Sequence, residues 1–142
     1  MKREGTCPCG AVRYSIDGPV RDVLVCHCAA CREATGGPWP ASAAHRRDLD
    51  VEDEAALIWE RAAVSEHGAS RGRCEACGTT VFWDAPGRET VSFAVSTLAD
   101  ASGLAIAGHI WLAEEGEDVP VSVGAPGYSR GMPASVVVAW RT

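Results

Sequence analysis

The chain has 142 residues, of which 46% are hydrophobic, so it can bury the core of one domain. The net charge of −6 gives no support to nucleic-acid binding, because such proteins usually present a basic patch and the arginines here are scattered. No apolar run approaches the roughly 18–20 residues that span a bilayer, and no apolar segment typical of a signal peptide follows Lys2 and Arg3. We therefore expect one domain over residues 1–142 in the reducing cytoplasm, with neither a membrane nor a nucleic acid as partner.

Short strands dominate the predicted secondary structure. Val12, Tyr14 and Ile16 alternate with polar residues, which is the pattern of a half-buried strand. Further strands are expected over residues 23–27, 55–60, 79–83, 90–98, 107–112 and 135–140. One helical turn is expected over residues 29–34, ended by a Gly-Gly-Pro sequence, whereas residues 46–56 are compatible with a loop or a helix. Many short strands with little helix indicate an all-β domain.

All seven cysteines fall into three short-range groups. These are a C-x-C pair, a C-x-C-x-x-C triplet and a C-x-x-C pair. In chain order they comprise Cys7 and Cys9; Cys26, Cys28 and Cys31; and Cys74 and Cys77. A reducing compartment disfavours disulfides. Ligands one or two residues apart can turn toward the same ion, so this spacing favours metal binding over free thiols.

A division of the cysteines into four plus three predicts two zinc sites of different kinds. A closed structural zinc takes four protein ligands, whereas a catalytic zinc keeps three and leaves one position open. The two pairs make the closed site and tie the N-terminal region to the middle of the chain. The triplet makes the open site, whose exchangeable fourth ligand is best matched by a soft thiolate. We expect two Zn²⁺ ions per chain, the second of them labile.

Other interpretations of the triplet stay open at this level. His27 or His109 could close its fourth position and make the site structural, or the three thiols could form a redox set. His27 stands between two ligands, so its side chain is expected to point away from the metal. His109 lies in an apolar segment, where a buried structural role is the simpler expectation. Trp39, the tryptophan nearest the triplet in sequence, is the best candidate to line a cleft, although packing is its simpler role.

Three motifs occur in order along nearly the whole chain. They are Gly5-Thr6-Cys7-Pro8-Cys9-Gly10, Cys26-His27-Cys28-Ala29-Ala30-Cys31-Arg32 and Cys74-Glu75-Ala76-Cys77-Gly78-Thr79. Two weaker blocks follow, Ser96-Thr97-Leu98-Ala99-Asp100 and Gly108-His109-Ile110. Together they resemble the glutathione-dependent formaldehyde-activating enzyme family, which also contains centromere protein V. The sequence departs from the family at Arg73, where an aromatic residue often stands.

The resemblance implies a fold, two metal sites and an activity. The fold is an all-β arrangement of packed antiparallel sheets called a β-tent. The implied structural zinc lies at Cys7, Cys9, Cys74 and Cys77, and the implied catalytic zinc at Cys26, Cys28 and Cys31. The activity is that of a carbon–sulfur lyase, which joins formaldehyde to a small thiol partner, glutathione, as S-hydroxymethylglutathione. The alternative is a zinc-stabilised binding module or a thiol carrier without significant catalysis.

The mechanism expected at the triplet is capture of a substrate thiol. Coordination to zinc deprotonates a thiol, and the bound thiolate would then be held beside the carbonyl that it attacks. Three thiolate ligands outweigh the charge of the ion, which makes it a weaker Lewis acid than a zinc held by neutral histidines. Arg13 and Arg32 are candidates to pair with substrate carboxylates, although a solvated surface position is the simpler expectation for each.

Overall fold

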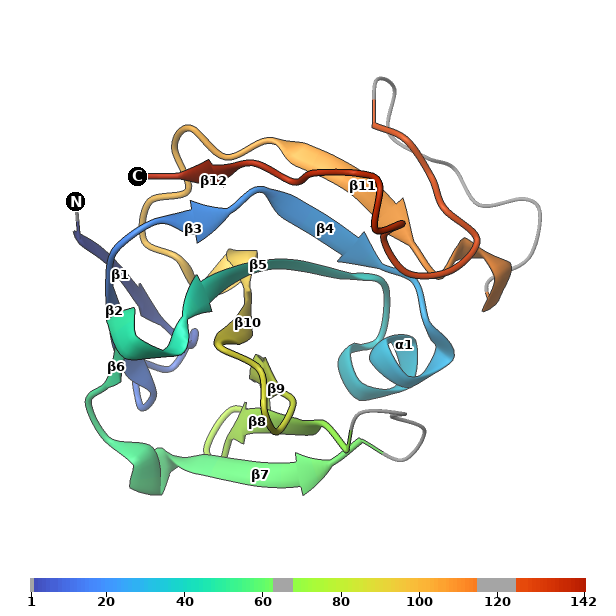
Figure 1. Ribbon diagram of the computed structural model, residues 1–142. Helices are drawn as coiled ribbons and strands as arrows, with labels where there is room; N and C mark the ends of the chain where they lie inside the picture. The colour runs from blue at the N-terminus through green and yellow to red at the C-terminus, as the bar shows by residue number, and fades with distance from the viewer. Residues whose placement is uncertain (1, 63–67, 115–124) are drawn as a thin grey trace.

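Two β-sheets and one α-helix make up the part of the chain described by the structure, a computed structural model covering residues 2–62, 68–114 and 125–142 (Figure 1). The helix is α1 (Ala29–Thr35). The strands are β1 (Lys2–Thr6), β2 (Arg13–Asp17), β3 (Val20–Arg21), β4 (Val23–Cys26), β5 (Trp39–His45), β6 (Leu49–Val51), β7 (Leu57–Arg61), β8 (Ser70–Cys74), β9 (Thr80–Asp84), β10 (Thr90–Ala94), β11 (Ile106–Ile110) and β12 (Trp140–Arg141). The predicted all-β fold is confirmed.

The smaller sheet has the strand order β1-β2-β6. The larger sheet runs β11-β4-β5-β10-β9-β8-β7, and β3 and β12 extend it beside β5. Pairing is antiparallel throughout these sheets except between β11 and β4, which run parallel. In Figure 1 the larger sheet passes from β4 and β5 through β10 to β7 and β8, and α1 lies at the side where these two ends face each other.

The alternation expected around Tyr14 is present in β2. Tyr14 and Ile16 are buried, and β2 pairs with β1 in a register that sets Gly5 opposite Tyr14. A side chain at Gly5 would collide with the Tyr14 ring, so only glycine fits there. Tyr14 in turn packs edge-on against Phe82, with ring centroids 5.2 Å apart, and these rings anchor the main hydrophobic core.

Two central strands carry no strand signal in the sequence. β5 contains Pro40 and is rich in alanine, and β8 reads Ser-Arg-Gly-Arg-Cys. Each is nevertheless hydrogen-bonded on both sides, β5 to β4 and β10, and β8 to β7 and β9. Pairing within the sheet therefore overrides the weak local preference of these segments.

Other strands differ from the prediction at their ends. β10 stops at Ala94, where a 3₁₀ turn follows (Val95–Thr97). β11 stops at Ile110 because Trp111 has a positive φ of 61°, which interrupts an extended strand. The strand predicted over residues 135–140 is wrong for most of its length, since only β12 forms there. The undecided segment 46–56 contains β6 between two 3₁₀ turns (Arg46–Asp48 and Glu54–Ala56).

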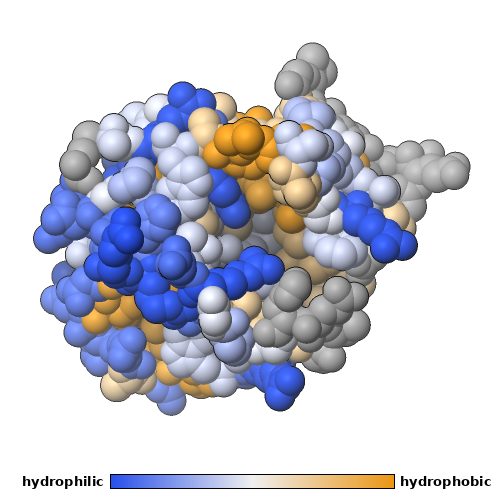
Figure 2. Space-filling view, viewed as in Figure 1, coloured by the Kyte–Doolittle hydropathy of each residue, from blue (hydrophilic) through white to orange (hydrophobic). Residues whose placement is uncertain are grey.

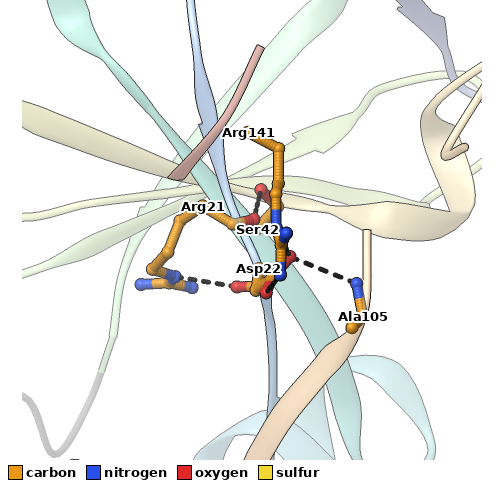
Figure 3. A network of polar contacts seen from close by, with 5 residues as sticks. All are labelled: Arg21, Asp22, Ser42, Ala105 and Arg141. Atoms are coloured by element: carbon orange, nitrogen blue, oxygen red, sulfur yellow. Dashed lines mark hydrogen bonds and ion pairs between the residues drawn. The ribbon is translucent and has the colours of Figure 1, made fainter. Parts of the chain in front are cut away.

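A buried carboxylate fastens the C-terminal segment to the larger sheet (Figure 3). Asp22 is 4% exposed, and its carboxylate accepts hydrogen bonds from Arg141 Nε at 3.0 Å and Nη2 at 2.7 Å and from the Ala105 N–H at 3.1 Å. The Arg141 guanidinium holds the pKa of Asp22 below its ordinary value. Asp22 thus joins β12 and the segment before β11 to the start of β4.

The surface is uneven in polarity (Figure 2). Hydrophilic side chains cover much of the side formed by the smaller sheet, and a hydrophobic patch lies on the side of β11 and β12. Exposed large apolar side chains of the described residues include Ile106, which begins β11, and Val137, which precedes β12. In the described ranges, no helix is both long and apolar enough to cross a membrane.

Candidate metal centres

The two cysteine pairs converge on one point although Cys9 and Cys74 are 65 positions apart in the chain. Cys7 and Cys9 follow β1, and Cys74 ends β8 with Cys77 in the turn after it. The Sγ–Sγ distances are 3.5 Å for Cys7–Cys9 and 3.6 Å for Cys9–Cys74, and all four sulfurs lie within 4.8 Å of one another. A tetrahedral zinc with Zn–S bonds of about 2.3 Å would separate its sulfurs by about 3.8 Å. The four-cysteine cluster therefore fits a zinc ion.

Backbone turns direct these sulfurs inward. The N–H groups of Val12 and Cys77 point to the sulfurs of Cys7 and Cys74, at 3.3 and 3.5 Å. Hydrogen bonds to sulfur of this kind favour the thiolate, the form that binds metal. Gly78 closes the second turn with a φ of +77°, a conformation that suits glycine.

The triplet is assembled locally at the junction of β4 and α1. Cys26 ends β4, Cys28 is the N-cap of α1, and Cys31 lies in its first turn. The Cys26 and Cys31 sulfurs are 3.4 Å apart, and the Cys31 N–H donates to Cys28 Sγ at 3.2 Å. The three sulfurs lie within 4.8 Å of one another, and no other Cys, His, Asp or Glu ligand atom of the described residues lies that close to all three. The three-cysteine cluster thus fits a metal ion whose fourth position is filled by none of the described residues.

The triplet favours a negative charge on Cys28. Hydrogen bonds from Cys26 and then Cys31 lower the pKa of Cys28 to about 2, helped by the Cys31 N–H and the charge of Arg71. Cys26 keeps its thiol proton, because its hydrogen bond with Cys28 raises the pKa of Cys26. A cluster that already shares a thiolate is suited to bind a cation.

The two histidines near the triplet face each other and not the sulfurs. His27 Nε2 lies 2.8 Å from His109 Nδ1, and both rings are buried, with 3% and 5% exposure. The parallel pairing of β4 and β11 brings them together, because it sets Val25 opposite His109. Burial, and then the neighbouring His27, lower the pKa of His109, which keeps it neutral at pH 7. Closure of the triplet by His27 or His109 finds no support in this geometry.

Arg71 is a residue near the triplet that sequence reasoning missed. It comes from β8, 40 positions away, and its Nη2 donates to Cys31 Sγ at 3.4 Å. Nothing in the local sequence marks it, because its approach depends on how the larger sheet curves toward α1. The two arginines considered from the sequence instead bond to backbone: Arg13 Nε donates to the Gly10 carbonyl and Arg32 Nε to that of His27.

Trp39 packs beneath the triplet. It is 7% exposed and pairs in register with Cys26 across β4 and β5. With Cys31 it forms part of a second hydrophobic cluster, against which Trp83 also packs. Its role is therefore packing, the simpler of the two expectations.

Comparison with known proteins agrees with this fold. A Rhodobacter sphaeroides protein whose crystal structure was solved as a structural-genomics target is similar to this chain, with a TM-score of 0.58 and 22% sequence identity. The match covers 88% of this chain and 99% of that protein. No curated protein sequence matches the chain significantly. The sequence model of the glutathione-dependent formaldehyde-activating enzymes matches residues 2–114, and the chain belongs to that family.

Proposed function

We propose that the protein acts as a zinc-dependent carbon–sulfur lyase that joins formaldehyde to a small thiol, glutathione by its family, to give S-hydroxymethylglutathione. The observation that carries the proposal is the contrast between a cluster with four cysteine ligands and a cluster with three. A donor set that lacks one ligand can accept that ligand from a substrate. The family supplies the expected substrate pair.

Each cluster has its own proposed part. Cys7, Cys9, Cys74 and Cys77 would hold a structural zinc within the single domain, and Cys26, Cys28 and Cys31 would hold a second zinc at the site of reaction. The spacing of the sulfurs supports both assignments. When bound at the triplet, zinc would supply an open coordination position that favours the deprotonated form of an incoming thiol.

The chain's own residues orient and stabilise the triplet. The Cys31 N–H donates to Cys28 Sγ, and this N-cap contact of α1 fixes the two cysteines relative to each other. The contact between His27 and His109 holds the backbone around Cys26 and Cys28 against β11. In the proposed reaction, the sulfur of the substrate thiol adds to the formaldehyde carbon, the C=O π bond breaks, and the thiol proton ends on the new hydroxyl group. Positioning of the two reactants is the protein's contribution.

The test is the exchange of formaldehyde between its free and glutathione-bound forms at equilibrium. Thiols add to formaldehyde without help, so the quantity to measure is the increase in exchange rate on adding zinc-loaded protein, with ¹³C-formaldehyde and NMR. We expect faster exchange with the wild type and the uncatalysed rate with Cys28→Ser. Binding of glutathione without faster exchange would instead identify a thiol carrier. No binding and no acceleration would reject the proposal.

A further inference from the structure

A metal-bound triplet would carry a net negative charge before any substrate binds. Three thiolates around one divalent ion carry a net charge of −1, and a fourth thiolate would raise this to −2. The chain as a whole is also acidic, with a net charge of −6. A positive group near the triplet would therefore favour the binding of an anionic fourth ligand.

Arg71 is placed to supply that charge. Its Nη2 lies 3.4 Å from Cys31 Sγ, and among the described residues this sulfur is its one hydrogen-bond partner. No carboxylate of the described residues forms an ion pair with it. Other arginines of the described residues do form ion pairs: Arg46 with Asp84, Arg47 with Asp48, Arg73 with Glu60 and Arg141 with Asp22. The charge of Arg71 is thus available to the sulfur cluster.

Its position in the sheet fixes this approach. In register, Arg71 lies between Glu60 of β7 and Trp83 of β9, and Trp83 packs against the cluster that contains Cys31. Arg73, two residues further along β8, turns its guanidinium to Glu60 Oε1 instead, at 2.8 Å. Two arginines of one strand therefore have different partners, a sulfur and a carboxylate.

We propose that Arg71 is a positioning residue that offsets the negative charge of the triplet and so admits a thiolate as its fourth ligand. The proposal rests on the proposed function, since it assumes a metal at Cys26, Cys28 and Cys31. It predicts selectivity by charge: Arg71 favours anionic ligands over neutral ones of similar size. It differs from recognition of a substrate carboxylate, which would depend on a group remote from the sulfur.

The test compares two ligands on the cobalt-substituted protein. 2-Mercaptoethanol binds as a thiolate and has no carboxylate, and imidazole binds as a neutral ligand, so their affinities are read from the visible spectrum. Arg71→Gln is expected to weaken binding of 2-mercaptoethanol roughly tenfold or more and that of imidazole less than about twofold. Arg71→Lys keeps the charge and is expected to retain most of the affinity. Arg73→Gln, the matched change on the same strand, is expected to bind both ligands as the wild type does.

Each other outcome overturns the proposal in a recognisable way. Equal losses for both ligands, or loss of cobalt from the triplet, would show that Arg71 is only structural. Unchanged binding of 2-mercaptoethanol combined with weaker binding of glutathione would make Arg71 a carboxylate-binding residue. If Arg71→Gln does not fold, the comparison is made with Arg71→Lys. Equal losses of 2-mercaptoethanol and imidazole binding in Arg71→Lys would show that Arg71 is only structural. A wild type that binds no thiol at all would reject the proposed function and this proposal with it.

Discussion

The two cysteine clusters contain the same side chain in different surroundings. In the four-cysteine cluster, Cys7 and Cys74 are 1% and 0% exposed and belong to the main hydrophobic core with Tyr14 and Phe82. The triplet lies in a smaller apolar cluster, and its three cysteines fall within six consecutive positions at the start of one short helix. The four-cysteine cluster joins distant segments of the chain. The triplet joins the end of β4 to the start of α1, and its contact with a distant strand is the hydrogen bond from Arg71 of β8.

This difference separates stability from chemistry. A metal that closes a long loop restricts the unfolded chain more than one that closes a short loop, and structural zinc can contribute roughly 10–16 kcal/mol of binding free energy to folding. A cluster that contributes little to the stability of the fold can have three protein ligands in place of four without unfolding the chain. The predictions below test whether the two clusters divide these roles.

Removing one ligand from each cluster should give the largest contrast. Cys77→Ser is expected to cost several kcal/mol, a large part of the roughly 5–15 kcal/mol by which a domain is stable. Cys28→Ser should cost less, because its cluster connects nearby residues, but should abolish thiol binding. Thermal unfolding and thiol titration of the two variants measure this. Equal destabilisation by both changes would make the triplet structural and favour a zinc-stabilised binding module.

Metal removal should reveal two classes of zinc. Protein purified without chelator is expected to hold up to two zinc ions per chain, and the triplet should lose its ion first because it has one protein ligand fewer. Elemental analysis during a mild chelator titration, with far-UV circular dichroism as a measure of folding, follows both ions. The fold should survive loss of the first ion and not of the second. A single class of zinc would contradict the division.

Matched glycine substitutions should give a smaller and sharper contrast. Gly36 caps α1 with a φ of +83°, and Gly78 closes the turn of the four-cysteine cluster with a φ of +77°; a Cβ at either would meet no atom within 4 Å. Alanine at each therefore introduces backbone strain alone, about 1 kcal/mol. Gly78→Ala should lower the melting temperature, whereas Gly36→Ala should chiefly speed zinc loss from the triplet. The reverse pattern would exchange the roles of the clusters.

Asp22 provides the smallest effect and a baseline that involves neither cluster. Because Arg141 lowers its folded-state pKa, the pair stabilises the fold fully above the unfolded-state pKa of about 4 and loses this effect as the pH falls through the lower folded-state value. Asp22→Asn removes it at every pH. The difference in melting temperature from the wild type should thus be steady between about pH 7 and 5 and shrink below about pH 4. A difference that grows on acidification would be inconsistent with this sign.

The extent of prediction from sequence differed between these regions for physical reasons. Ligand spacing and the alternation in β2 are local, so the two cysteine clusters, the strand around Tyr14 and the helix at the triplet could be predicted. β5 and β8 could not, because their residues become strands only through neighbours on both sides. Arg71 could not either, since its contact with Cys31 depends on the curvature of the whole sheet. Trp111 has a positive φ that its residue type disfavours, so the end of β11 was equally hidden.

The most direct test of the two-site account is a crystal structure of the zinc-loaded protein grown with glutathione, with anomalous data at the zinc edge. We predict two zinc ions. The ion at Cys7, Cys9, Cys74 and Cys77 should have these four sulfurs as its complete ligand set. The ion at Cys26, Cys28 and Cys31 should have the glutathione sulfur or another exogenous ligand as its fourth. A side chain of this protein in that fourth position, or a triplet without zinc, would contradict the account.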